Sequence, residues 1–173
     1  MQIRIVHRIF GTNVVLKEMG IINSHDCSFC NDEKDSIDHM FWKCKYIKEF
    51  WKSLQELLRR KCEMANNITL TESIVLFGTE ENFWSDVTFD FIILLAKQYL
   101  TRCKFNKCRP LISIFVGMLK ARHAVKKYIA TIHLNMQKFN SNWMNYLKLL
   151  ETDNYFFLSY NSLCKSVYVL DKH

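Results

Sequence analysis

The spacing of apolar residues along the chain predicts a protein built mainly from α-helices. The clearest helical period lies between residues 46 and 61, where one face is apolar and the other is charged or polar. The apolar positions of that face are Ile47, Phe50, Trp51, Leu54, Leu57 and Leu58. A shorter helix is predicted after Thr12, a good N-cap residue, and it should stop at Gly20. Strands and helices do not alternate, so the pattern favours a mostly α fold over a parallel α/β sheet.

The second half of the chain shows two further helical patterns. The first covers about residues 85–104, with apolar positions at Phe89, Ile92, Ile93, Leu95, Ala96, Tyr99 and Leu100. Pro110 marks the start of a longer helix, because proline is favoured in a first helical turn. The expected core positions of this helix are Phe115, Met118, Leu119, Val125, Ile129 and Ile132. We expect a break near residues 140–142, after which Trp143, Tyr146, Leu147 and Leu150 repeat the pattern.

Length and composition indicate an ordinary globular chain. The 173 residues are 49% hydrophobic and 14% aromatic, with four Gly and one Pro, which excludes a disordered or low-complexity protein. We predict a small domain at residues 1–62, a helical module at residues 63–152 and a tail or edge strand at residues 153–173. The longest strictly apolar run, residues 91–96, is far shorter than the roughly 20 residues that span a bilayer, so we expect no membrane association.

The positive charge of the chain is concentrated in one block. The formal net charge is +7, yet residues 1–90 hold 11 basic and 14 acidic residues, and residues 151–173 hold 2 and 3. Residues 91–150 hold 11 basic residues and no acidic one. A positive electrostatic field of this kind bears on the binding partner and favours a polyanion, although any single lysine could equally lie on a solvated helix face.

Four metal-binding residue types lie close together in the first third of the chain. Cys27 and Cys30 share a tight turn, and His39 and Cys44 follow. Three sulfurs and one nitrogen are the donor set of a closed structural zinc site, which predicts a small zinc-binding knuckle ahead of a helical bundle. The five residues from His39 to Cys44 would turn a continuous helix by about 500° and leave the two side chains about 140° apart. We therefore expect a short helix from about residue 36 to end near residue 43, with Cys44 at or beyond its end.

Other interpretations of the cysteines stay open at this stage. The four residues could be unrelated, with free cysteines packed as small apolar side chains. His25 is a rival ligand that spacing does not exclude, whereas Cys103 and Cys108 have no nearby third ligand and suit core packing better. The chain has seven Cys, and its first eight residues lack the apolar core of a signal peptide, so we expect a reducing compartment, the nucleus or the cytoplasm. Lys43 and Lys45 are expected to offset the negative charge of a zinc site with three thiolates.

Several strings in this region together resemble a known family. They are His7-Arg8-Ile9-Phe10-Gly11-Thr12-Asn13, Leu16, Gly20-Ile21, Cys27-x2-Cys30, Asp38-His39-Met40-Phe41-Trp42-x-Cys44 and Phe50-Trp51. In this order they resemble the zinc-binding domain of non-LTR (LINE-type) retrotransposon reverse transcriptases, over roughly residues 4–58. Leu94-Leu95-Ala96-Lys97, residues 104–107 and Pro110 are similar, more weakly, to the C-terminal extension of such elements.

The resemblance implies one structural zinc ion held by Cys27, Cys30, His39 and Cys44. It also implies RNA or DNA binding during target-primed reverse transcription, by a fragment or relic of a larger element. Catalysis is not expected, because the chain has no Asp-Asp pair for a polymerase and a Cys₃His zinc site leaves no open position for water. The sequence also lacks the Glu and the second Cys pair of a zinc deaminase.

Nucleic-acid binding is the function that the basic block favours, through phosphate contacts without sequence preference. The candidate contacts are Lys97, Arg102, Lys104, Lys107, Arg109, Lys120, Arg122, Lys126 and Lys127. Four aromatic residues could stack on unpaired bases: Tyr99, Phe105, His123 and Tyr128. The alternative is a zinc-stabilised interaction module that docks on a host protein or on the polymerase body of the same element. Its interface would be the apolar stripe from Ile47 to Leu58, if that stripe were exposed.

Overall fold

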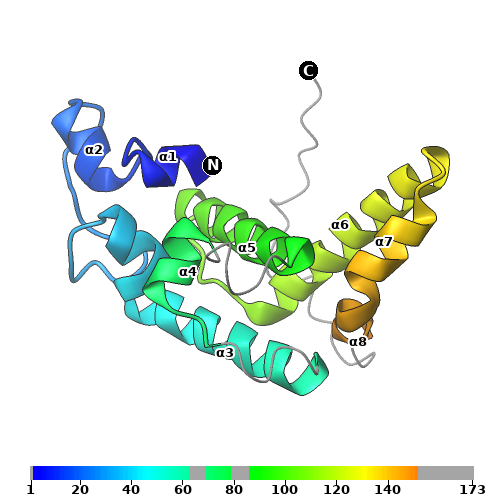
Figure 1. Cartoon of the computed structure of the whole chain (residues 1–173). Helices are drawn as coiled ribbons and strands as arrows, with labels where there is room; N and C mark the ends of the chain where they lie inside the picture. Colours follow the sequence, from blue (N-terminus) through cyan, green and yellow to red (C-terminus); the bar gives the residue numbers. More distant parts are fainter. Residues whose placement is uncertain (1, 63–68, 79–85, 152–173) are drawn as a thin grey trace.

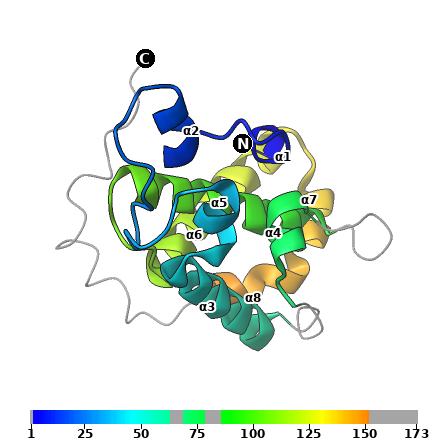
Figure 2. The same cartoon turned by 90° about the vertical axis from the view of Figure 1, so that its left-hand side faces the viewer.

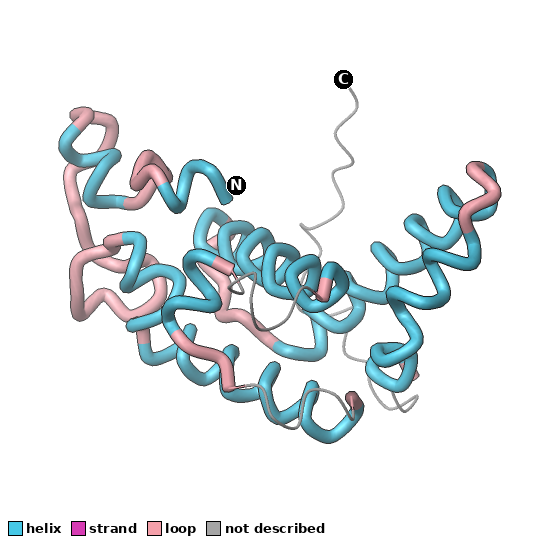
Figure 3. The backbone as a smooth tube through the Cα atoms, in the orientation of Figure 1, coloured by secondary structure: helices cyan, strands magenta, loops and turns pink. Residues whose placement is uncertain are grey.

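The computed structural model describes residues 2–62, 69–78 and 86–151, and this part of the chain contains helices and no strand (Figures 1 and 3). The mostly α prediction is therefore confirmed, while the expected tail at residues 153–173 lies outside the described residues. The elements, in chain order, are α1 (Gln2–Val6), α2 (Asn13–Glu18), the π-helix η1 (His39–Lys43), α3 (Lys45–Lys61), α4 (Glu72–Phe77), α5 (Val87–Phe105), α6 (Ile112–Ile132), α7 (Met136–Trp143), the 3-10 helix η3 (Met144–Tyr146) and α8 (Leu147–Leu150). None of the described helices is long and apolar enough to cross a membrane.

Local sequence signals explain where the predicted helices begin and end. Thr12 caps α2, because its hydroxyl accepts a hydrogen bond from the Val15 N–H at 3.4 Å, and Gly20 follows the helix with a φ of +71°. The Asp86 carboxylate accepts hydrogen bonds from two N–H groups at the start of α5. In α3, the six apolar positions expected from the period are all buried.

The turn between α6 and α7 lies earlier than the sequence indicated. We expected a break near residues 140–142, but α7 runs through these positions and the turn is at residues 133–135. Leu134 has a φ of +53°, and the Asn135 N–H bonds the Ala130 carbonyl at 2.8 Å, which closes the end of α6. A left-handed residue at such an end is usually Gly, so a Leu in that place gave no signal.

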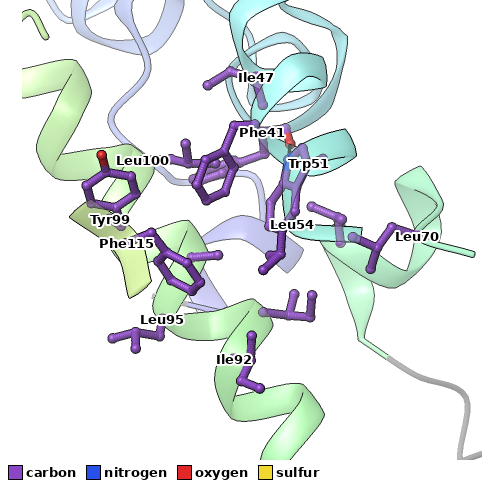
Figure 4. Close-up of a cluster of buried hydrophobic side chains, with 14 of the residues drawn as sticks. Phe41, Ile47, Trp51, Leu54, Leu70, Ile92, Leu95, Tyr99, Leu100 and Phe115 are labelled. Atoms are coloured by element: carbon purple, nitrogen blue, oxygen red, sulfur yellow. Dashed lines mark hydrogen bonds between the residues drawn. The ribbon is translucent and has the colours of Figure 1, made fainter. Parts of the chain in front are cut away.

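Most of the buried apolar side chains form one cluster, which includes residues from both sides of the expected domain boundary at residue 62 (Figure 4). The ring of Phe50 in α3 lies 5.7 Å from Tyr99 in α5 and 5.6 Å from Phe115 in α6. Phe41 of η1 and Trp51 of α3 lie in the same cluster. The apolar stripe of α3 is thus core and not an exposed interface.

The α6–α7 hairpin extends beyond the core on the side away from α1 and α2 (Figure 1). Seen from the side that carries α1 and α2, α3 lies below α5 and α6 (Figure 2). Val125, Ile129 and Ile132 were expected in the core, yet they lie on the surface of this hairpin, and this part of the core prediction is wrong. The helical period placed them on a common face but could not say which face is covered.

Candidate metal centre

A tight turn positions the first two cysteines. Asp26 and Lys34 form an isolated antiparallel bridge, and the Cys27 N–H bonds the Glu33 carbonyl at 2.8 Å. The chain reverses inside this small hairpin, where Asn31 has a φ of +56° and its N–H bonds the Cys27 carbonyl at 2.9 Å. The side chains of Cys27 and Cys30 are therefore presented on the same side of the turn.

A π-helix and a chain break position the other two candidates. The N–H of Cys44 bonds the carbonyl of His39 at 3.0 Å, an i to i−5 bond that widens the turn. Cys44 itself has φ −57° and ψ 134°, which ends the π-helix and starts α3 at the next residue. The prediction that the short helix ends near residue 43, with Cys44 beyond its end, is confirmed.

The structure brings the four residues together. One sulfur each of Cys27, Cys30 and Cys44 and one ring nitrogen of His39 all lie within 4.8 Å of one another. The sulfurs of Cys27 and Cys44 are 3.9 Å apart, and Cys30 Sγ is 3.4 Å from His39 Nε2. Around a tetrahedral zinc ion, Zn–S bonds of about 2.3 Å and a Zn–N bond of about 2.0 Å set sulfurs about 3.8 Å apart and sulfur and nitrogen about 3.5 Å apart. The donor set and its spacing fit zinc.

The two buried thiols of this cluster differ in acidity. Cys27 donates a hydrogen bond to Cys44, and this bond together with burial raises the pKa of Cys27. The pKa of Cys44 is lowered, first because its sulfur accepts that bond and then because the N–H groups of Tyr46 and Ile47 point to it from the start of α3. Cys44 is thus the more acidic thiol of the pair, and a bound zinc ion would displace the protons that remain on the cysteines.

His39 is held so that Nε2 faces the sulfurs. The side chain is buried, and the Glu33 carboxylate lies 3.2 Å from Nδ1, within ion-pair distance but not aligned for a hydrogen bond. The Glu33 carboxylate therefore lies where it can favour the orientation of the ring in which Nδ1 faces away from the sulfurs.

The rival residues lie elsewhere. Nδ1 of His25 pairs with the Asp26 carboxylate at 3.1 Å, and His25 is not part of the Cys/His cluster. Cys103 is buried in the core cluster, in agreement with the packing interpretation, and Cys108 packs against that cluster.

The expected charge compensation by two lysines takes a different form. Lys45 pairs with Asp32 at 2.7 Å, and Lys43 pairs with Glu72 at 3.6 Å. Each lysine that was expected to offset the thiolates therefore also has a carboxylate partner.

Aromatic contacts fix the metal-binding region to α3. The rings of Phe10 and Phe41 meet edge to face at 5.2 Å, and the indole N–H of Trp51 bonds the Phe41 carbonyl at 2.7 Å. The residues between His39 and Cys44 are thus anchored in the core.

A buried ion pair, which sequence reasoning missed, joins the metal-binding region to α5. The ammonium of Lys104 lies 2.5 Å from the carboxylate of Asp35, with side-chain exposures of 3% and 0%. Lys104 also donates to the Gly11 carbonyl, and Asp35 accepts from the Asn13 N–H at 2.8 Å. Asp35 is one of several acidic residues in an exposed-looking loop, so no local pattern distinguished it.

Two of the nine candidate phosphate contacts are wrong, because their side chains are buried and already partnered. Lys104 belongs to the ion pair with Asp35. Lys97 is 2% exposed, donates to the Gln2 side chain and to the Val75 carbonyl, and has its pKa lowered to about 8 by burial. Gln2 in turn donates to the Leu76 carbonyl at 2.7 Å, so Lys97 connects α5 to α1 and α4, two helices that the sequence did not predict.

The remaining cations lie outside the core in two groups. The zinc-proximal cations, at the end of α5 and just after it, are Arg102, Lys107 and Arg109. Arg109 touches the start of α3, with its guanidinium 4.4 Å from the Tyr46 ring and a 3.0 Å hydrogen bond to its hydroxyl. The arm cations, Arg122, Lys126 and Lys127, are exposed on the second half of α6, whereas Lys120 is partly buried. Because Arg122 and Lys127 lie 10 and 15 residues after the start of α6, about 15–23 Å along its axis, the two groups do not form a single compact patch.

Of the four aromatic residues that could stack on bases, two are enclosed by the fold and two are exposed. Tyr99 is in the core, with its hydroxyl bonded to the backbone of Leu111, and His123 packs between Phe139 and Trp143, so neither can stack on a base. Phe105 and Tyr128 are exposed by 64% and 68%. Phe105 lies beside the zinc-proximal cations and Tyr128 beside the arm cations.

Residues 2–51 match the family model described as zinc-binding in reverse transcriptase. This stretch contains all four members of the Cys/His cluster, so the matched region and the geometry agree. No curated protein and no solved structure matches the chain.

Proposed function

We propose that this chain is a non-catalytic nucleic-acid-binding module, stabilised by one zinc ion and descended from the C-terminal part of a LINE-type reverse transcriptase. The matched zinc-binding region supports the reverse-transcriptase origin, and the weaker similarity of residues 94–110 supports the C-terminal placement. The proposed partner is RNA or DNA, bound mainly through its phosphates. The six cysteines that the structure describes are all free thiols, which suits a nuclear or cytoplasmic location.

The zinc ion has a structural role in this proposal. Cys27, Cys30, His39 and Cys44 would hold it, and four protein ligands leave no position for a reacting water. Its contribution is to fold the knuckle, with an apparent binding free energy on the order of 10 kcal/mol at neutral pH. The lack of an Asp-Asp pair, together with a family match that covers a zinc-binding region alone, supports a non-catalytic role.

The observation that carries nucleic-acid binding is the block of residues 91–150, which holds exposed cations and no acidic residue. Residues 91–150 contain 11 basic residues, and the described part of the structure pairs none of Arg102, Lys107, Arg122 and Lys127 with a carboxylate. We assign the first contacts to the zinc-proximal cations, because Arg109 contacts Tyr46 of the matched zinc-binding region and the exposed Phe105 beside these cations can stack on a base.

Equilibrium binding of a single-stranded RNA at several salt concentrations tests the proposal, with fluorescence anisotropy as the readout. A plot of log affinity against log salt falls with a slope of about −0.7 for each phosphate contact to a single strand. We expect Arg102→Gln with Lys107→Gln to weaken binding and to make this slope about 1.4 less steep. The matched control is Lys48→Gln with Lys52→Gln, which removes the same charge from exposed positions of α3 and should leave the slope unchanged.

Two outcomes contradict the proposal. The zinc-loaded wild-type chain could bind neither RNA nor DNA at low salt, or the control and test variants could lose affinity equally. Equal losses would indicate a response to net charge alone. The protein-interaction alternative loses its main support in the structure, because the stripe of α3 that would have formed the interface is buried.

A further inference from the structure

The loop between α5 and α6 is fixed on both sides of Arg109. On one side, the Cys108 N–H bonds the Cys103 carbonyl at 3.0 Å and closes the end of α5. On the other side, the Tyr99 hydroxyl accepts a hydrogen bond from the Leu111 N–H at 2.8 Å and donates one to the Leu111 carbonyl at 3.1 Å. The backbone of Arg109 is therefore held in place by its neighbours.

The side chain of Arg109 is exposed and yet ordered by a contact. Its guanidinium carbon lies 4.4 Å from the centroid of the Tyr46 ring, and its Nη2 donates to the Tyr46 hydroxyl at 3.0 Å. None of the ion pairs within residues 2–62, 69–78 and 86–151 involves Arg109. A long side chain usually loses rotamer freedom when it binds a ligand. The contact with Tyr46 has already ordered this guanidinium, so a ligand would meet it in a fixed position.

One face of this guanidinium remains for a ligand. The Tyr46 ring covers the opposite face, and Arg109 is exposed to solvent. A planar guanidinium stacks on flat π systems, whereas the ammonium of lysine is a compact charge without a plane. Proteins that bind single-stranded RNA stack unpaired bases on guanidinium planes as well as on aromatic rings. A base inside a duplex is covered by its neighbours on both faces, so an unpaired base is the form that fits this position.

The charges around Arg109 suit the phosphates of the same strand. Lys107, two residues earlier, is exposed, and the described residues place no carboxylate in an ion pair with it. Lys45 lies 5.4 Å from the centroid of the Tyr46 ring, although Asp32 offsets its charge through an ion pair of 2.7 Å. A strand whose base lies on Arg109 can therefore place a phosphate against Lys107.

We propose that the guanidinium of Arg109, supported by the Tyr46 ring, stacks on one unpaired base of a single-stranded nucleic acid. The inference rests on the proposed function, since it adds a base contact to the phosphate contacts of the zinc-proximal cations. Tyr46 follows Cys44 by two residues, so the metal-binding region positions the ring that supports Arg109.

Substitution of Arg109 by lysine tests the base contact, because it keeps the charge and removes the plane. Fluorescence anisotropy compares three ligands of the full-length, zinc-loaded chain: a short RNA single strand, the RNA duplex of the same sequence, and an abasic strand of the same length that keeps every phosphate. Arg109→Lys should weaken binding of the single strand about 10-fold, as expected for the loss of one stacked base, and should bind the duplex and the abasic strand like wild type. The matched control, Arg60→Lys at an exposed position of α3, should bind all three ligands like wild type.

A second variant examines the ring beneath the guanidinium. Tyr46→Leu removes the ring and its hydroxyl but keeps an apolar side chain. It should weaken binding of the single strand by a similar factor and leave binding of the abasic strand unchanged. Zinc content and circular dichroism check that each variant stays folded, and Arg109→Lys decides alone if Tyr46→Leu does not fold.

The outcomes separate this base contact from the proposed function. If the wild-type chain binds no nucleic acid at low salt, the proposed function fails and the base contact fails with it. If the wild-type chain binds the single strand and the abasic strand equally well, or if Arg109→Lys binds the single strand like wild type, the base contact is overturned and the phosphate contacts stand. Equal losses for all three ligands in Arg109→Lys would also overturn it, since Arg109 would then support the loop or bind a phosphate and not a base.

Discussion

Replacement of Lys104 by methionine should destabilise the whole chain, although sequence reasoning placed Lys104 among the phosphate contacts. The ammonium lies 2.5 Å from the Asp35 carboxylate, and both side chains are almost fully enclosed. Methionine fills most of the space of the lysine but leaves the carboxylate buried without its cation. Removing one member of a buried ion pair costs about 3–5 kcal/mol, which is a large part of the stability of a domain of this size.

A second substitution at Asp35 should recover much of this loss. Asparagine in place of Asp35 is neutral and still offers an oxygen to the N–H of Asn13, which now donates to the carboxylate at 2.8 Å. The double variant Asp35→Asn with Lys104→Met therefore lacks an unpaired buried charge. We expect a residual cost of about 1–2 kcal/mol, because the Gly11 carbonyl loses its donor and the packing changes.

Urea unfolding at a fixed free zinc concentration measures both effects through the free energy of unfolding. The exposed neighbour Lys107 provides the control, and Lys107→Gln should change the free energy of unfolding by less than about 0.5 kcal/mol. A cost below about 1 kcal/mol for Lys104→Met, or a double variant less stable than this single variant, would refute the reasoning.

Three further predictions follow from other parts of the structure. Cys44→Ser should lose the one bound zinc ion per chain and much of the far-ultraviolet helix signal, whereas the control Cys108→Ser should keep both. Metal analysis measures the zinc and circular dichroism measures the helix signal. Retained zinc in Cys44→Ser would show that Cys44 is not a ligand. Burial lowers the pKa of Lys97 from 10.5 to about 8, so the folded chain gives up this proton before the unfolded chain does. The stability of wild type relative to Lys97→Met should therefore rise by about 3 kcal/mol between pH 8 and pH 10.5 in urea unfolding, and parallel pH curves would contradict it. The Asp86 carboxylate caps α5 and also accepts a hydrogen bond from the Tyr146 hydroxyl at 2.6 Å. Asp86→Ala should therefore lower the free energy of unfolding by about 2–3 kcal/mol, and Tyr146→Phe by about 1 kcal/mol. Equal losses would show that the cap contributes little.

Features that depend on short-range periodicity were predictable from the sequence. The buried face of α3 follows directly from the 3.6-residue period, and all six of its expected apolar positions are in the core. The break at Cys44 followed from helix geometry alone, since His39 and Cys44 could not share one ion from a straight helix. Thr12 and Gly20 marked the ends of α2 through their side-chain chemistry.

Features that depend on contacts between distant residues were not predictable. Lys97 and Lys104 follow the buried Ile93 and Leu100 by four residues, so the period of α5 places them beside its apolar face, away from Arg102. Their partners Gln2 and Asp35 are brought near only by the fold, and no local pattern indicated them. For the same reason the period of α6 could not show that α7 would cover one face and leave the other open.

The buried Lys104 connects the metal-binding region to the cations that we propose bind nucleic acid. The zinc-proximal cations lie at the end of α5, where Lys104 is tied to Asp35 and where Arg109 rests on Tyr46, two residues after Cys44. Loss of zinc would release Asp35 and Tyr46 from their positions, and the end of α5 would lose its support. If the proposed function is correct, removal of zinc should therefore weaken RNA binding even though no metal ligand touches the RNA, and the loss should be largest at the zinc-proximal cations.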